Sequence, residues 1–264
     1  MIDVEGRARD LERIREALHE AGAILRRFSR HGIRVRYKAH GSPVTEADLA
    51  VDAALRRALP RAGEGWLSEE TPDGPGRLAC QRVWVVDPLD GTREFLEGVP
   101  QWNVSIGLVD SGVAGAGGVY NPATDELFLG APGLGATLND RPMGTSRRTC
   151  LEGAVVLTTR GAPRRGRPPT ADTRFTMRPV GPLAYSLALI ASGRADALWS
   201  RSAKAEWDVA AGAALITAAG GYVTQWDGTP PPFNRWPPRI AGPVAGAAGL
   251  RAPVRQSIIS PSGR

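Results

Sequence analysis

The chain has 264 residues, of which 42% are hydrophobic and 23% charged, and its formal net charge is +6. This composition is typical of a globular protein with a sizeable core, and it excludes a fibrous or largely disordered chain. No lysine-rich tail, RNA-binding aromatic motif or zinc-finger spacing is present, which disfavours nucleic-acid binding. The positive charge, nearly all of it from arginine, would instead help to recruit a small anionic substrate.

The first predicted element is an amphipathic helix over 11–28, where apolar residues recur at three- and four-residue spacing. A short alternating strand over 33–37 and a second helix over 49–59 follow. Thr45 and Asp48 precede the second helix with the spacing of a capping box. Asp48 is therefore either a capping residue or a residue that faces a site.

The next predicted strand, 66–68, leads into the paired acids Glu69 and Glu70. Adjacent glutamates usually belong to a solvated loop, because like charges prefer water. Here the pair follows an apolar strand and comes shortly before a second acidic segment. Glu69 is therefore a candidate ligand for a cation shared with that segment.

The second acidic segment, Val85 to Phe95, is the one around which the chain is organised. An apolar strand delivers Asp87 and Asp90, and a Gly91-Thr92 turn then opens a helix. Carboxylates bind hard cations such as Mg²⁺, and N–H groups at a helix start attract an anion. The alternative is an Asp-rich turn that only caps a helix.

The second half alternates strands and helices less regularly. Strands are expected over 104–109, 117–120, 126–129, 136–138 and 195–199, and helices over 183–192 and 206–219. Asp208 lies at the start of the last helix, where an acid either caps the helix or, if the helix packs closely, points inward. The segment 160–169 is expected to be an exposed, anion-attracting loop, and 230–264 gives no clear pattern.

The placement of the acids favours one chemistry. Glu69, Asp87, Asp90 and Asp208 all lie at strand ends or helix starts. Four acids gathered in one place would repel one another unless cations neutralise them. A site for several Mg²⁺ ions, which would activate water and clamp phosphoryl oxygens, predicts metal-assisted hydrolysis of a phosphate ester.

Four motifs, in order and spacing, resemble the inositol monophosphatase family: Ser42-Pro-Val-Thr-Glu-Ala-Asp48, Ser68-Glu-Glu-Thr71, Asp87-Pro-Leu-Asp-Gly-Thr92 and Trp207-Asp-Val-Ala-Ala-Gly212. The resemblance runs from Ser42 to about Gly221. It implies a layered αβαβα sandwich of the α+β or α/β class and a lithium-sensitive phosphomonoesterase that uses two or three Mg²⁺ ions. A homodimer is common in that family.

The resemblance also implies roles for single residues. The metal ligands would be the side chains of Glu69, Asp87, Asp90 and Asp208 and the carbonyl of Leu89. Asp48, Glu69 and Thr92 would act catalytically by orienting the attacking water. The amides of Gly91 and Thr92 would hold the phosphate, and Asp208 and Arg201 would complete the substrate-binding residues.

Different parts of the sequence resemble branches of the family with different substrates. The continuation Thr92-Arg-Glu-Phe95 is similar to the 3′(2′),5′-bisphosphate nucleotidase branch, whereas Gly118–Phe128 and Gly133–Pro142 resemble bacterial inositol phosphatases. Pro182 stands where family members usually have Ser or Thr, and Arg201 lies near the place of an acid that contacts the inositol. A cation there favours a second anionic group on the substrate.

The best specific hypothesis is therefore hydrolysis of 3′-phosphoadenosine 5′-phosphate to AMP. Hydrolysis of inositol 1-phosphate, or of histidinol phosphate or a sugar phosphate, is the alternative. The non-enzymatic alternative is an anion-binding regulatory homologue, which loss of a metal ligand would indicate.

The chain is long enough for two packed halves, expected at 1–150 and 151–264. Cys80 and Cys150 are isolated thiols without a Cys-x-x-Cys pair, which suits a reducing compartment. The first residues lack the apolar core of a signal peptide, and the longest apolar stretch, Val209–Ala219, is too short to cross a bilayer. These features predict a cytoplasmic protein.

Overall fold

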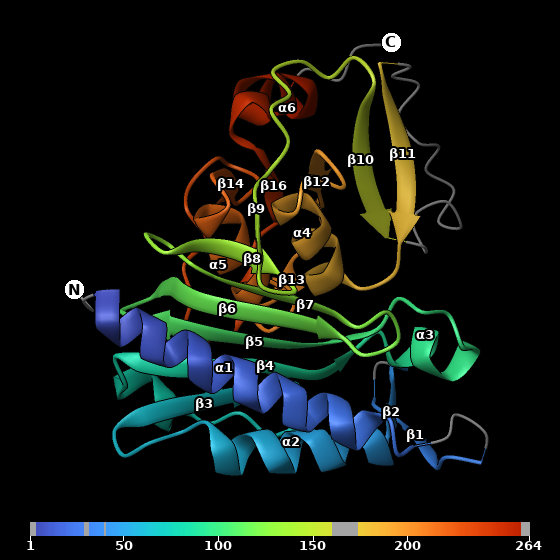
Figure 1. Ribbon diagram of the computed structural model, residues 1–264, viewed down its shortest axis with the longest axis vertical. Coiled ribbons are helices and arrows are strands. Elements are labelled where there is room, and N and C mark those ends of the chain that lie inside the picture. Colours follow the sequence, from blue (N-terminus) through green and yellow to red (C-terminus); the bar gives the residue numbers. More distant parts are fainter. Residues whose placement is uncertain (1–3, 29–31, 40, 160–173, 260–264) are drawn as a thin grey trace.

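Helix and sheet layers alternate through the molecule, and the computed structural model describes residues 4–28, 32–39, 41–159 and 174–259 (Figure 1). Helices α1 (Val4–Leu25) and α2 (Glu46–Ala58) cover one face of a seven-stranded sheet. Helices α4 (Leu183–Ala191) and α5 (Ala210–Ala218) lie between that sheet and a five-stranded one. Val254 of α6 (Arg251–Ile259) packs in the core of the second sheet. The predicted layered αβαβα sandwich is confirmed.

The seven-stranded sheet has the order β3-β4-β5-β6-β7-β8-β9. Its first two strands are parallel and every later pair is antiparallel. The strands are β3 (Glu64–Ser68), β4 (Arg82–Asp90), β5 (Asn103–Asp110), β6 (Val113–Asn121), β7 (Glu126–Ala131), β8 (Gly135–Leu138) and β9 (Arg141–Met143).

The five-stranded sheet has the order β11-β10-β12-β16-β14 and mixes parallel with antiparallel pairs. Its strands are β10 (Ala154–Thr159), β11 (Phe175–Val180), β12 (Ala197–Trp199), β14 (Gly221–Thr224) and β16 (Val244–Ala247). The sequence patterns predicted only β12 of these. The remaining elements are β1 (Val35–Tyr37) paired with β2 (Pro43–Thr45), β13 (Lys204–Ala205) paired with β15 (Arg239–Ile240), α3 (Thr92–Glu97), and the 3₁₀ turns η1 (Pro75–Ala79) and η3 (Ala248–Leu250).

Helix α5 packs almost directly on the backbone of the seven-stranded sheet. A Cβ placed on Gly107 would lie 2.8 Å from the Cβ of Ala210, and one on Gly117 would lie 2.5 Å from the carbonyl oxygen of Ala211. Both contacts are too short for a real side chain, so glycine in the strands and alanine in the helix allow the approach. This bears out the expected close packing of the small-residue helix.

Several predicted boundaries are wrong; helix α1, for example, begins at Val4 and not at residue 11, because its first two turns are mostly polar and lack the apolar spacing. Helix α5 begins at Ala210 and not at Glu206, because the carbonyl of Glu206 accepts from the N–H groups of Val209 and Ala210 in a tight turn. Helix α1 ends at Leu25, and the following strand begins at Val35. The predicted loop 160–169 lies outside the described residues.

The two sheets fall on either side of residue 150, yet one hydrophobic core joins them. Leu187 of α4 and Ala211 of α5 share a cluster with Val83 and Phe128 of the seven-stranded sheet. We propose that 1–150 and 151–264 are two halves packed too intimately to be independent.

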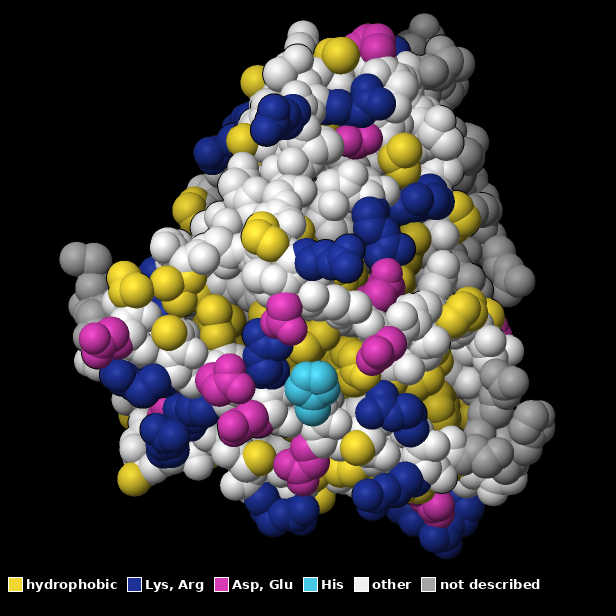
Figure 2. Space-filling view, in the orientation of Figure 1, with side chains coloured by type: hydrophobic (Ala, Val, Ile, Leu, Met, Phe, Trp, Pro, Cys, Tyr) yellow, Lys and Arg dark blue, Asp and Glu magenta, His cyan; other side chains and the backbone are white. Residues whose placement is uncertain are grey.

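On the face in Figure 2, Lys and Arg side chains are interspersed with Asp and Glu. Within the described ranges, no helix combines the length and the apolar character that a bilayer-crossing segment requires.

Candidate metal and phosphate site

A pocket of about 570 Å³ lies where β4 ends, between the two sheets, and the acids Glu69, Asp87, Asp90 and Asp208 line it. Glu69 directly follows β3, and its N–H donates to the carbonyl of Val86 at 3.2 Å. Because β3 and β4 are parallel, their carboxyl ends bring Glu69 beside Asp87. Asp208 arrives from the turn before α5, which close packing holds against the sheet.

A register shift at the end of β4 sets the direction of two acids. Asp87 pairs with Ser105 and Asp90 with Asn103, so β4 carries one extra residue between them. One carboxylate oxygen of Asp87 accepts from the N–H of Leu89 at 3.0 Å. Asp90 accepts from the N–H of Ala184, in the first turn of α4, at 2.9 Å. The bulge therefore directs Asp87 toward Glu69 and ties Asp90 to the second half.

Three of the acids come close enough to share a cation. One carboxylate oxygen from each of Glu69, Asp87 and Asp208 lies within 4.8 Å of the other two. Asp90 stands beside this trio, and its pKa is raised first by burial and then by the charge of Asp208. Oxygen donors alone at this spacing suit a hard cation such as Mg²⁺.

The electrostatics of the cluster point the same way. Burial, with the charges of Glu69, Asp90 and Asp208, raises the pKa of Asp87 well above its usual range. Burial and the charge of Glu69 raise the pKa of Asp208 to about 7. Without a cation, these carboxyl groups keep their protons to a higher pH than exposed Asp side chains do. The residues present therefore fit a divalent metal ion, which would displace those protons.

Asp48 caps a helix and also contacts Thr92, a residue of the pocket, so the two hypotheses for it are compatible. One oxygen accepts from the N–H of Thr45 at 2.8 Å, which completes a capping box at the start of α2. The other accepts from the Thr92 hydroxyl at 3.0 Å. Thr92 lines the pocket, and the carbonyl oxygen of Leu89 lies 3.2 Å from its hydroxyl. Asp48 thus acts on the pocket through Thr92.

Gly91 forms the N-cap of α3 in a left-handed conformation with φ of 96°. An added Cβ would lie 2.7 Å from the Cγ of Pro182, so both the backbone angle and the space require glycine. Pro182 is itself the N-cap of α4. The two helix starts, α3 and α4, therefore meet at one wall of the pocket.

Basic residues that the sequence patterns did not single out also line the pocket. The Lys38 ammonium lies 2.7 Å from Glu69 and 2.8 Å from Glu70. Burial alone would lower the pKa of Lys38, but these two carboxylates outweigh burial and raise it. Lys204 and Arg239 line another part. The only available signal was that Lys38 and Lys204 are the sole lysines of an arginine-rich chain.

Arg201 lies apart from these residues. Its guanidinium carbon is 5.2 Å from the centre of the Trp226 ring, and Arg201 is exposed and not among the pocket's lining residues. The structure thus brings together Glu69, Asp87, Asp90, Asp208, Leu89, Gly91 and Thr92, with Asp48 behind Thr92, and leaves Arg201 outside.

Comparisons with known proteins agree with this geometry. Residues 9–259 match the model of the inositol monophosphatase family. The chain is 37% identical over 233 residues to an inositol-1-monophosphatase of Rhizobium meliloti, which covers 83% of this chain and 86% of that protein. It is 34% identical over 262 residues to the Nus factor SuhB of Xylella fastidiosa, with 93% and 92% covered.

Solved structures show the same relationship. The extragenic suppressor protein suhB of Bartonella henselae superposes with a TM-score of 0.81 at 31% identity, covering 94% of this chain and 97% of that one. The inositol monophosphatase of Anabaena gives a TM-score of 0.76 at 30% identity, with 96% of each chain covered. The chain therefore belongs to the inositol monophosphatase family and is a phosphatase, a hydrolase of phosphoric monoesters.

Proposed function

We propose that this phosphatase hydrolyses a small phosphomonoester at the pocket where β4 ends, with two or three Mg²⁺ ions as cofactor. The observation that supports this is the meeting of three carboxylates within 4.8 Å of one another beside the Gly91-Thr92 helix start. The carboxylates suit cations, and the N–H groups of a helix start suit the phosphate that those cations also attract.

The metal site would consist of the side chains of Glu69, Asp87, Asp90 and Asp208 with the Leu89 carbonyl. Bound Mg²⁺ would supply an acidified water and would stabilise negative charge on the phosphoryl oxygens. The chain's own contribution is to hold these oxygen donors in place. Asp87 is only 2% exposed, whereas Glu69, Asp90 and Asp208 are partly exposed to the pocket.

Thr92 and Asp48 would orient the attacking water, together with Glu69. Asp48 accepts the hydrogen bond that the Thr92 hydroxyl donates, so the oxygen of Thr92 keeps lone pairs to accept a hydrogen bond from water. The water oxygen would form the new P–O bond and the water would lose a proton, the ester P–O bond would break, and the leaving oxygen would take up a proton. The amides of Gly91 and Thr92 would hold the phosphate meanwhile.

For the substrate we propose 3′-phosphoadenosine 5′-phosphate, which would yield AMP. The Thr92-Arg-Glu-Phe95 continuation of the central motif supports this choice, and so does a pocket of about 570 Å³, which has room for more than one phosphate. The alternative is inositol 1-phosphate, which the names of several relatives favour. Histidinol phosphate and sugar phosphates are further candidates.

The test is release of inorganic phosphate from 3′-phosphoadenosine 5′-phosphate and inositol 1-phosphate in parallel, with and without Mg²⁺ and with added Li⁺. We expect Mg²⁺-dependent, Li⁺-inhibited release with preference for the nucleotide. Preference for inositol 1-phosphate would overturn the substrate and leave the chemistry intact. Release that ignores Mg²⁺ would overturn the metal assignment, and no release from any ester would favour a regulatory, anion-binding role.

We also propose that the protein forms a homodimer, as the family resemblance implies. Light scattering coupled to size exclusion should give twice the 28.0 kDa mass of the chain. A monomer at working concentration would contradict this.

A further inference from the structure

Two basic residues at the pocket have no use in holding metal or in orienting water. Lys204 and Arg239 line it, and neither side chain forms an ion pair or hydrogen bond with another side chain in the described ranges. The other two basic lining residues are engaged: Lys38 pairs with Glu69 and Glu70, and Arg93 donates to the Gly41 carbonyl at 3.1 Å. Lys204 and Arg239 are therefore the two basic lining residues whose side chains have no hydrogen-bond or ion-pair partner among the described residues.

Both residues belong to one two-stranded ribbon. Lys204 opens β13 and Arg239 opens β15, and the strands pair antiparallel with Ala205 opposite Arg239. Their charges both act on Asp208, whose pKa they lower against the larger opposing effect of burial. Two cations on adjacent strands, within electrostatic reach of the same metal-site acid, form a compact positive region at the pocket.

A buried carboxylate fixes the segment that leads into the second strand of this ribbon. Glu206, which is 0% exposed, accepts from the N–H of Asn234 and the N–H of Arg235, each at 2.8 Å. Arg77, only 4% exposed, donates to the Asn234 side chain at 2.7 Å and to the Arg235 carbonyl at 2.9 Å. The segment leading into β15 is thus fixed before any ligand arrives, which lowers the entropy cost of binding.

Charge balance suggests what this region binds. Once cations neutralise Glu69, Asp87, Asp90 and Asp208, Glu94 is the one acid left among the described lining residues, against four basic ones. The positive charge of Lys204 and Arg239 then acts on the substrate, in a pocket of about 570 Å³ that extends beyond what one phosphate occupies. A second anionic group on the substrate would meet two donors at this wall.

We propose that Lys204 and Arg239 form a subsite for a second phosphate, distinct from the one that is cleaved, and that they set the preference for bisphosphorylated over monophosphorylated esters. This inference rests on the proposed function of the same pocket. It assigns to these two residues the role that the sequence resemblance suggested for Arg201, which stacks on Trp226 outside the pocket.

The experiment compares Lys204→Met and Arg239→Met on two substrates that differ only in the second anion, 3′-phosphoadenosine 5′-phosphate and adenosine 3′-monophosphate, with saturating Mg²⁺. Each variant should raise KM for the bisphosphate about 10-fold or more, with kcat nearly unchanged, since each removes a charge-assisted contact to the second phosphate and none to the reacting one. Kinetic constants for the monophosphate should stay within about twofold of wild type. Arg201→Met is the matched control and should behave as wild type on both.

Three outcomes would overturn the subsite. Equal losses on both substrates would mean that the two charges only balance Asp208. No loss on either would mean that they do not touch the substrate. A selective loss in Arg201→Met alone would place the second anion elsewhere.

The failure of the proposed function would look different. If the wild type hydrolyses neither ester, calorimetric titration of the same two ligands in the presence of Mg²⁺ decides the subsite alone. Tighter binding of the bisphosphate that is lost in Lys204→Met and Arg239→Met would support it, and equal binding of the two ligands would refute it.

Discussion

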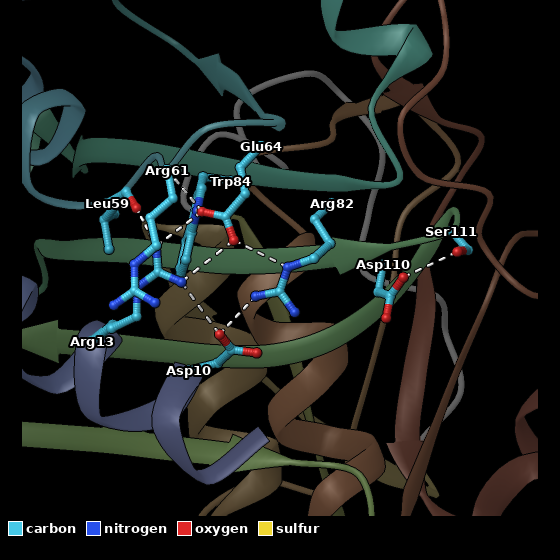
Figure 3. Close-up of polar contacts among 9 residues, drawn as sticks. All are labelled: Asp10, Arg13, Leu59, Arg61, Glu64, Arg82, Trp84, Asp110 and Ser111. Carbon is cyan, nitrogen blue, oxygen red and sulfur yellow. Dashed lines mark hydrogen bonds and ion pairs between the residues drawn. The ribbon is translucent and has the colours of Figure 1, made fainter. Parts of the chain in front are cut away.

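The parallel strands β3 and β4 carry acids at both ends, and the two ends are built in opposite ways. At their amino ends, the Glu64 carboxylate forms ion pairs with Arg13 at 2.9 Å and Arg82 at 3.0 Å (Figure 3). It also accepts a hydrogen bond from the Trp84 ring N–H at 2.8 Å. Asp10 of α1 completes the cluster with Arg82 at 2.7 Å. Each carboxylate there has an arginine, so the charges balance.

At their carboxyl ends, five acids line one pocket, namely Glu69, Asp87, Asp90, Glu94 and Asp208, and Lys38 is the only ammonium or guanidinium that forms an ion pair with any of them among the described residues. Burial would raise the pKa of Glu64, but its hydrogen bonds to Arg13 and Trp84 lower that pKa to about 2. Burial and Glu69 instead raise the pKa of Asp208 to about 7. Carboxylates that pair with arginine would destabilise the fold if their partner were lost, whereas the unpaired carboxylates at the pocket are candidate ligands for a cation.

The largest expected effect is at the acids of the pocket. Asp87→Asn should lower Mg²⁺-dependent phosphate release by at least about 100-fold. Loss of a residue that only hydrogen-bonds to a metal ligand already costs up to about 100-fold in activity, and loss of a ligand should cost no less. Asp110→Asn is the control and should keep wild-type turnover, because Asp110 lies at the end of β5 that is away from the pocket. The measurement is initial rate against Mg²⁺ concentration. Near-normal activity in Asp87→Asn would remove Asp87 from the metal site.

At the balanced end the effect should be on stability and not on activity. Glu64→Gln should lower the free energy of unfolding by about 2–4 kcal/mol, because it leaves Arg13 and Arg82 with an uncompensated charge. Glu5→Gln is the control: its ion pair with Arg9 is 3.7 Å long and exposed, and should contribute at most about 1 kcal/mol. Urea denaturation measures both. Equal losses would mean that the Glu64 cluster is no stronger than a surface pair.

The two ends should also respond oppositely to pH. The folded pKa of Glu64 is depressed from 4.5 to about 2, so its stabilisation is complete above about pH 4.5 and is lost as the pH falls toward 2. The folded pKa of Asp208 is raised from 3.8 to about 7, so its contribution is present below about pH 4 and lost as the pH rises through 7.

Metal-free protein should therefore melt at a lower temperature at about pH 8 than at about pH 5, and Mg²⁺ should raise Tm more at the higher pH. Differential scanning fluorimetry with and without chelator measures this. A rise in Tm on adding Mg²⁺ that is the same at both pH values would contradict the account of the acidic cluster.

The smallest expected effect concerns the one cation that already pairs with an acid of the pocket among the described residues. Lys38→Met should lower the Mg²⁺ concentration at half-maximal activity by roughly 3–10-fold, because it removes a positive charge that competes for Glu69. Arg36→Met is the control: Arg36 lies in β1, two residues before Lys38, and is exposed, so that concentration should stay unchanged. A requirement for more Mg²⁺ in Lys38→Met would instead mean that Lys38 helps to shape the site.

Much of the fold was predictable because its signals are local. Apolar spacing predicted α1, α2 and α4, and alternating or apolar runs predicted most strands of the seven-stranded sheet. The tail was not predictable, since β14 (Gly-Tyr-Val-Thr) and β16 (Val-Ala-Gly-Ala) have only four residues each and are paired across at least twenty residues of chain. Strands β10 and β11 also escaped, because a parallel pair needs a long connection that leaves no hairpin signal.

For the site, the sequence by itself determined which acids end strands or start helices, and four ordered motifs carried the family resemblance. Only the tertiary structure decided which charges meet. It paired Lys38 with Glu69, placed Lys204 and Arg239 at the pocket and left Arg201 on Trp226. The physical reason is range: a turn or cap depends on neighbours along the chain, whereas the electrostatics of a pocket depend on groups that only packing brings together.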